Sequence, residues 1–256
     1  MDLFDLTGKT ALVTGGTSGI GLAICRAFGA AGARVIASSE NAQACAKTEA
    51  ELGDAGYQAH GVLCDVSDRA NVERLVETVH SFAGRIDILV SNAGIEGPVG
   101  PSGTAGLEEF HRLFAINLES AVWLSGLLAP HMARLGGGSI ILMSSLSGLR
   151  GNRAIGSYAM TKAALAQLAR NLAVEWGGDN VRANAISPGL IRTPFSEKLM
   201  SDESFMQRRL QITPLGRVGT PEEIAGTAVY LASAAGAFVT GQNIVVDGGT
   251  IISDGG

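Results

Sequence analysis

The sequence is poor in aromatic side chains and in cysteine, and both scarcities narrow what the protein can be. Aromatic residues make up 5% of the 256 residues, whereas glycine accounts for 35 of them. Small and aliphatic side chains in such excess are typical of helices packed closely on a sheet. Cys25, Cys45 and Cys64 show neither CxxC spacing nor an even count, so we expect reduced thiols in the core.

Metal-binding and membrane patterns are also absent from the sequence. The four histidines, His60, His80, His111 and His131, do not have the spacing of metal ligands, and we predict no metal. No apolar run reaches the length of a membrane span, and the N-terminus MDLFDLTGKT lacks the apolar core of a signal peptide. We therefore expect a soluble, cytoplasmic protein that binds no membrane.

Positive charge is in short supply as well. The chain has 19 Lys and Arg residues against 24 Asp and Glu residues, a formal net charge of −5, and its basic residues are scattered. Binding to nucleic acid depends on a concentrated basic surface. We predict no nucleic-acid partner and expect a small-molecule ligand instead.

What the sequence does contain is a regular alternation of short apolar runs and helical patterns. Strands are expected at 9–14, 33–38, 58–64, 86–91, 139–144, 181–187 and 243–247, and helices at 22–31, 42–52, 69–82, 107–135, 157–176 and 221–232. Strands joined by single helices form parallel sheets through right-handed crossovers. The pattern predicts one α/β domain over residues 1–256, with a doubly wound parallel sheet of about seven strands. We expect the helix at 107–135 to be interrupted near Pro130.

A glycine-rich loop follows the first expected strand. The run Gly15-Gly-Thr-Ser-Gly-Ile-Gly21 leads directly into the first helix. Free backbone N–H groups and the helix dipole both favour an anion at such a place, and phosphate is the expected ligand. The spacing GxxxGxG differs from the GxGxxG of dinucleotide sites, so the loop alone leaves open a phosphate site or a plain turn.

A second chemical pattern lies in the helix expected from Ser157. Tyr158 and Lys162 are four residues apart and therefore share one helical face. A phenol titrates near ~10 and transfers protons poorly at neutral pH unless a nearby cation favours the phenolate. Ser145 lies just past a strand end, where its hydroxyl can reach the same substrate oxygen. The three side chains can act as proton donor, electrostatic activator and oxyanion stabiliser.

Other polar residues gather at the carboxyl ends of the expected strands, the edge at which doubly wound sheets bind ligands. They are Thr14, Ser39, Asp65, Asn92, Ser145 and Ser187. Beyond the sixth strand, an amphipathic segment at 195–212 contains Met200 and Met206. We interpret 190–212 as a substrate lid, and packing of this segment against the domain remains the alternative.

These motifs, in this order, resemble those of the short-chain dehydrogenase/reductases over essentially the whole chain. The family's nucleotide loop TGxxxGxG stands here as residues 14–21, which accounts for the glycine spacing. The family's adenine-contacting aspartate matches Asp65, and its NAG turn matches residues 92–94. Its PG segment, which holds the nicotinamide carboxamide, matches residues 188–193. The resemblance implies a Rossmann-type fold and an NAD(P)-dependent alcohol dehydrogenase or carbonyl reductase.

The resemblance also implies the site residues. The active-site residues would be Asn117, Ser145, Tyr158 and Lys162, with Tyr158 as general acid/base and Ser145 stabilising the alkoxide. Lys162 would lower the tyrosine pKa and hold the nicotinamide ribose, and Asn117 would anchor a water that links Lys162 to solvent. The cofactor-binding residues would be Gly15, Thr17, Ser18, Gly19, Ile20, Gly21, Ser39, Glu40, Asp65, Val66, Asn92, Ala93, Gly94, Tyr158, Lys162, Pro188, Gly189, Ile191 and Thr193.

The end of the second strand bears on the choice between NAD and NADP. A 2′-phosphate calls for Arg or Lys there, whereas a free 2′-hydroxyl is compatible with an acidic acceptor. Glu40 therefore favours NAD, with NADP the less favoured cofactor. Ser39 stands where the resemblance places an NAD-selecting aspartate, so it remains open whether Glu40 is a solvated residue at the start of the next helix.

The expected pocket walls are mainly aliphatic, with Arg150, Arg153 and Arg192 nearby, and indicate a secondary alcohol or ketone with an apolar body. An isomerase or dehydratase on the same scaffold, or a non-catalytic nucleotide-binding protein, is the alternative. The helices at 107–135 and 157–176 carry more apolar and small residues than one buried face requires. They include Ala121, Trp123, Leu127, Leu128, Leu165, Leu168 and Ala169, and they predict a homo-oligomer, specifically a tetramer.

Overall fold

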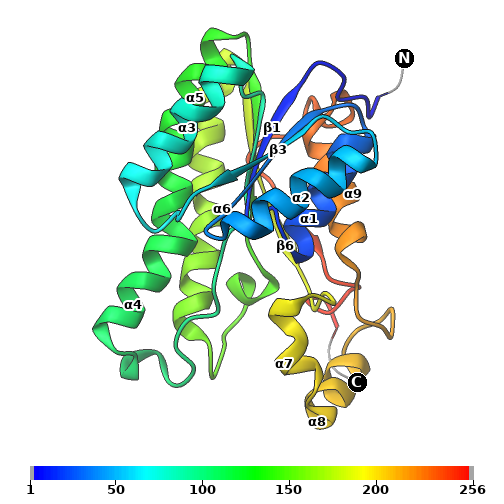
Figure 1. Cartoon of the computed structure of the whole chain (residues 1–256). Coiled ribbons are helices and arrows are strands. Elements are labelled where there is room, and N and C mark those ends of the chain that lie inside the picture. The colour runs from blue at the N-terminus through cyan, green and yellow to red at the C-terminus, as the bar shows by residue number, and fades with distance from the viewer. Residues whose placement is uncertain (1–2, 254–256) are drawn as a thin grey trace.

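Short runs of aliphatic residues form a single parallel sheet in this computed structural model, which describes residues 3–253 (Figure 1). Its strands are β1 Thr10–Thr14, β2 Arg34–Ser39, β3 Ala59–Leu63, β4 Ile88–Ser91, β5 Gly138–Met143, β6 Val181–Pro188 and β7 Asn243–Val246. They pair in the order β3-β2-β1-β4-β5-β6-β7, so the direction of winding reverses between β1 and β4. The doubly wound fold predicted from the sequence is confirmed.

Helices cover both faces of this sheet, as Figure 1 shows. They are α1 Gly19–Ala30, α2 Ala42–Asp54, α3 Arg69–Ala83, α4 Leu107–Phe114, α5 Ser120–Arg134, α6 Gly156–Trp176, α7 Glu197–Met200, α8 Glu203–Gln211 and α9 Pro221–Ala232. Alternate residues of β1 enter different cores: Leu12 packs with residues of α3, α5 and α6, whereas Ala11 and Val13 pack with α1 and α9. Two apolar layers therefore hold the carboxyl ends of the strands in one row.

The predicted interruption at Pro130 is wrong. Pro130 lies inside α5, which continues to Arg134. Fully buried neighbours, among them Leu128 and Met132, anchor the helix to the core and offset the hydrogen bond that proline cannot donate. The irregularity lies instead at Ala115–Glu119, a π-helical turn between α4 and α5. Such turns often occur at functional sites, and this one contains Asn117.

The amphipathic segment at 195–212 contains two short helices, α7 and α8. The chain breaks between them because the Asp202 side chain accepts a hydrogen bond from the Phe205 N–H at 2.9 Å and so starts a new helix. In Figure 1 both helices lie beyond the carboxyl edge of the sheet, outside the layers that cover its faces.

Residues 107–134 are the one stretch within the described residues that is long and apolar enough to cross a membrane, which the sequence analysis did not anticipate. Within its most apolar window, 44% of the residues are buried inside the protein. Leu124 and Leu128 are among the fully buried core residues. A core helix passes the same test of length and composition.

The cysteines and histidines occupy different settings. Cys25, Cys45 and Cys64 are free and buried, which confirms the prediction of core thiols. His80 of α3 and His131 of α5 stack with their ring centroids 4.0 Å apart. Burial lowers the pKa of both imidazoles. In the part of the chain that the structure describes, no group of three potential metal ligands forms around them or elsewhere.

Candidate active site

The carboxyl edge of the sheet opens into a cleft of about 1030 Å³. The glycine loop, the ends of β4 and β5, the first turns of α6 and the lid helices all contribute to its wall. Every site residue predicted from the sequence lines this cleft except Gly21 and Asn117. One cavity therefore joins the expected cofactor residues to the expected catalytic residues.

The glycine loop leaves room for a phosphate. Gly15 and Gly19 have φ values of 62° and 50°, which favour glycine. A Cβ at Gly19 would lie 3.3 Å from the Thr193 side chain, so a larger residue would fill the gap between loop and lid. Ser18 caps α1 without a side-chain hydrogen bond, so the first N–H groups of the helix have no side-chain acceptor there, and Ser18, Gly19 and Ile20 line the cleft. These residues fit a nicotinamide dinucleotide whose pyrophosphate lies at the start of α1.

Gly21 has a packing role instead. A Cβ on this residue would lie 2.0 Å from the Gly15 carbonyl oxygen and 2.7 Å from the amide nitrogen of Asn92. Only glycine allows α1 to approach the loop and the end of β4 this closely. Gly21 thus shapes the nucleotide site without lining it.

The NAG turn is tied to the end of β1. Asn92 donates from Nδ2 to the carbonyl oxygens of Thr14 and Gly15 at 3.0 and 3.2 Å. Thr14 Oγ1 accepts from the backbone N–H groups of Asn92 and Ala93. A Cβ on Gly94 would lie 3.4 Å from Lys162 Nζ and 3.4 Å from Asn117 Oδ1, so glycine permits a close approach to the catalytic group.

The expected adenosine end of the cleft is polar, with Glu40 and Asp65 in its wall and the charge of Arg112 acting on Asp65. Ser39 donates to Glu40 Oε2 at 3.2 Å, and both residues line the cleft. The N-cap of α2 is Asn41, so Glu40 precedes the helix rather than starting it. Asp65 accepts hydrogen bonds from the side chain and backbone of Ser67, which lower its carboxyl pKa.

Tyr158, Ser145 and Lys162 meet at the other end of the cleft. Lys162 is buried, with 4% of its surface exposed, and its Nζ donates to the Met143 carbonyl oxygen at 2.8 Å. The same nitrogen lies 5.5 Å from the centroid of the Tyr158 ring. Ser144 donates to the Lys162 carbonyl oxygen at 2.7 Å and so ties α6 to the end of β5. The sequence analysis missed Ser144, because adjacent serines after a strand do not indicate which one supports the helix.

The pKa of Tyr158 is raised in this fold, whereas the resemblance implied that Lys162 would lower it. Burial raises the pKa of Tyr158 to about 12, a hydrogen bond with Ser145 partly offsets this, and the charge of Glu96 adds to it. Burial lowers the pKa of Lys162 to about 8. Loss of water around the phenol is the largest cause of this shift, and the Lys162 ammonium donates to the Met143 carbonyl oxygen. Near neutral pH the tyrosine is a protonated phenol.

Asn117 lies beneath the cleft. It is 2% exposed, and the backbone N–H of Ile95 donates to its Oδ1 at 2.8 Å. Its Nδ2 donates to the Ile95 carbonyl oxygen at 2.9 Å and to Thr161 Oγ1 at 3.4 Å. The buried amide therefore has protein partners, and it holds the loop after β4 against α6. Its role as a water anchor stays a prediction.

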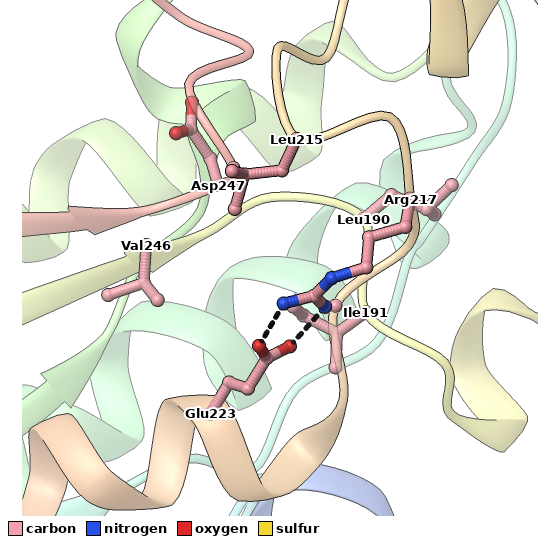
Figure 2. A pocket seen from close by; sticks show the side chains of 9 residues that line it. Leu190, Ile191, Leu215, Arg217, Glu223, Val246 and Asp247 are labelled. Carbon is pink, nitrogen blue, oxygen red and sulfur yellow. Dashed lines mark hydrogen bonds and ion pairs between the residues drawn. The ribbon is translucent and has the colours of Figure 1, made fainter.

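An ion pair between Arg217 and Glu223 lies beside residues 188–193, the segment expected to hold the cofactor. Figure 2 shows a smaller cavity, of about 90 Å³, in which Arg217 and Glu223 face each other. They form two hydrogen bonds, of 2.9 and 2.5 Å, and Glu223 also accepts from the Thr220 N–H to cap α9. Ile191 pairs with Gly219 beside them. This contact, which no sequence motif indicates, fixes the segment that carries Thr193.

Known proteins are similar to this chain over the residues that form the cleft. A family model described as "Enoyl-(Acyl carrier protein) reductase" matches residues 15–250. The chain belongs to the short-chain dehydrogenase/reductase family. Like other members, this short-chain dehydrogenase/reductase is an oxidoreductase that uses a nicotinamide cofactor.

Several relatives and solved structures are similar to this chain over nearly its whole length. A tropinone reductase homologue of Arabidopsis thaliana is 42% identical over 246 residues, which cover 95% of this chain and 93% of that protein. The gluconate 5-dehydrogenase of Burkholderia cenocepacia, solved with NADP and tartrate, is 34% identical, with a TM-score of 0.95 over 98% of both chains. A 7α-hydroxysteroid dehydrogenase solved with NADH and a 7-oxo bile acid is 38% identical, with a TM-score of 0.92 over 97% of this chain and 96% of its own.

Proposed function

We propose that this enzyme transfers a hydride reversibly between a nicotinamide cofactor and a secondary alcohol or ketone, with Tyr158 as general acid/base. The observation that supports this proposal is that Ser145 and Tyr158 line the same cleft as the glycine loop, with Lys162 Nζ 5.5 Å from the centroid of the Tyr158 ring. Two hydroxyl groups that converge on one point can both bind a single substrate oxygen.

Each side chain has a distinct part in the proposed reaction. When bound, the nicotinamide ring donates or accepts the hydride. The Tyr158 hydroxyl gives its proton to the carbonyl oxygen during reduction and takes it back during oxidation. Ser145 Oγ already accepts from the Ser147 N–H at 3.1 Å, which leaves its own proton for the substrate oxygen. Lys162 would hold the nicotinamide ribose through its buried ammonium.

A screen of alcohols and ketones, read by cofactor absorbance at ~340 nm, tests the reaction class, because only net redox chemistry changes the reduced cofactor pool. An isomerase, a dehydratase or a non-catalytic nucleotide-binding protein would leave that pool unchanged. Since the family model carries the description of an enoyl reductase, an α,β-unsaturated ketone belongs in the screen. Formation of the unsaturated alcohol would support carbonyl reduction, and formation of the saturated ketone would contradict it.

We propose that NAD(H) is the preferred cofactor. Glu40 lines the cleft beside Ser39, and neither Lys nor Arg comes from the glycine loop or the start of α2 among the lining residues described. The NADP bound in the gluconate 5-dehydrogenase and in two further neighbours argues for the other choice, whereas the NADH in the hydroxysteroid dehydrogenase argues for this one.

Glu40→Arg should shrink or invert a wild-type preference for NADH over NADPH. The change removes a carboxylate–phosphate repulsion and adds an attraction, each worth up to ~1 kcal/mol at an exposed site, so the ratio of the two kcat/KM values should move by roughly tenfold. Glu77→Arg on α3, an exposed residue that does not line the cleft, is the matched control. A wild-type enzyme that prefers NADPH would overturn the proposal.

We also propose a homotetramer that forms through α5 and α6. Four of the seven residues named from the sequence, Ala121, Leu128, Leu165 and Ala169, are buried in the chain's own core and so do not argue for an interface. Leu127 is 36% exposed, and Val122 and Val174 are exposed at 45% and 87%, which leaves apolar surface on both helices. Light scattering at micromolar concentration should return four chain masses, and a monomer mass would reject the proposal.

A further inference from the structure

Four arginines line the end of the cleft opposite the adenosine residues. Arg150 and Arg153 follow the 3₁₀ turn Leu146–Leu149, and Arg208 and Arg209 belong to α8. Within residues 3–253, none of the four forms an ion pair. Glu96, whose charge acts on Tyr158, also lines this cleft, so the fold gathers four arginines near the substrate end with one carboxylate of the cleft wall to oppose them.

Arg209 is the most constrained member of this group. Its guanidinium carbon lies 5.3 Å from the centroid of the Phe205 ring, one turn earlier on α8. The Nη1 atom is buried and has no hydrogen-bond partner among the described residues. Burial lowers the pKa of Arg209, and the charge of Arg150 lowers it further. A charged donor without an acceptor costs free energy, and a nearby like charge adds to that cost.

Asp247 does not relieve this unfavourable arrangement. Its negative charge acts on Arg209, but its two carboxylate oxygens accept from the backbone N–H groups of Gly249 and Ile251 at 2.8 and 2.7 Å. It forms no ion pair with Arg209. Arg209 Nη1 therefore lacks an acceptor within the described residues, and a ligand bound in the cleft would supply one.

We infer that Arg209 and Arg150 bind a carboxylate on the substrate, so that the enzyme acts on a hydroxy acid or oxo acid. The inference rests on the proposed alcohol–ketone chemistry and specifies its substrate class. Guanidinium groups bind carboxylates through paired hydrogen bonds, which would supply the missing acceptors. The secondary alcohol or ketone with an apolar body that the sequence indicates would then also carry an anionic end.

The arrangement of the lid places this carboxylate at a distance from the reacting carbon. Arg150 lies five residues after Ser145, on the turn that leaves β5. The Phe195 ring, at the start of the lid, is 6.2 Å from the Tyr158 ring, and Arg209 follows at the far end of α8. The carbonyl group would thus lie at Tyr158 and the carboxylate beneath α8.

The test compares oxo acids with their methyl esters, using 4-oxopentanoate to 7-oxooctanoate and a saturating reduced cofactor. The wild type should prefer one of the acids over its ester. Arg209→Gln and Arg150→Gln should each lower kcat/KM for that acid by ~10- to 100-fold, mainly through KM, and leave the ester unchanged. Arg74→Gln, on the exposed face of α3 and away from the cleft, should change neither. Equal turnover of acids and esters, or equal losses for both in the variants, would overturn the inference, as would a preference for dihydroxyacetone phosphate over every acid.

A binding measurement separates this inference from the reaction class. Glutarate, which cannot react, should raise the thermal midpoint of the wild type, and Arg209→Gln should abolish the rise while keeping its own midpoint in buffer. If no oxo acid or ester is reduced but the glutarate shift depends on Arg209, the proposed reaction fails and the carboxylate site stands. If ketones are reduced and glutarate gives no shift in the wild type, the carboxylate site fails and the reaction stands.

Discussion

Tyr158→Phe should lower kcat by at least ~10²-fold and leave the fold and cofactor affinity nearly unchanged, because it removes only the atom that transfers the proton. The phenyl ring preserves the packing of this half-buried side chain near Phe195. Steady-state kinetics with a substrate from the screen measure the loss, and NADH fluorescence titration checks cofactor binding. Near-normal turnover in the variant would disprove the assigned role.

The pH dependence of the wild type should have a defined sign. Because the folded chain raises the pKa of Tyr158 to about 12, the phenol is protonated near neutrality and ready to donate during reduction. Oxidation needs the phenolate, so its rate should rise with pH through the alkaline range, while reduction should slow. In Tyr158→Phe, the oxidation rate should no longer rise with pH. An oxidation rate that is flat above neutrality in the wild type would contradict the assignment.

Lys162→Ala should weaken both cofactor binding and turnover. The ammonium is buried and donates to the Met143 carbonyl oxygen, so its removal deletes a charged donor and leaves a buried acceptor without its partner. We expect the Kd for NADH to rise by ~10-fold or more and kcat to fall by ~10²-fold. Fluorescence titration and steady-state kinetics measure the two effects separately.

Lys47→Ala, an exposed lysine on α2, controls for the loss of one positive charge. Thermal denaturation distinguishes a damaged site from a damaged fold, since Ser144 also ties α6 to β5 through the backbone of residue 162. A loss of kcat with unchanged affinity for NADH would rule out the proposed contact with the nicotinamide ribose.

The sequence by itself determined the strands, the crossovers and most of the cleft lining, although Gly21 and Asn117 lie outside it. Strand and helix periods arise between near neighbours, so the alternation of residues 9–91 already dictated a parallel sheet. A parallel sheet in turn brings its carboxyl ends together, which placed Ser39, Asp65, Asn92 and Ser145 around one cavity before any contact was known, whereas Thr14 and Ser187 do not line it.

Only the tertiary structure decided where the polar side chains point. Asn117 bonds to Ile95, 22 residues away, and Lys162 to Met143, 19 residues away, so no local period encodes either contact. No local period encodes the proximity of Arg209 and Arg150 either, because the two residues lie on separate segments of the chain. Patterns along a chain indicate which residues are buried. The hydrogen-bond partners and neighbouring charges of a buried group come from distant segments, so they depend on the tertiary structure.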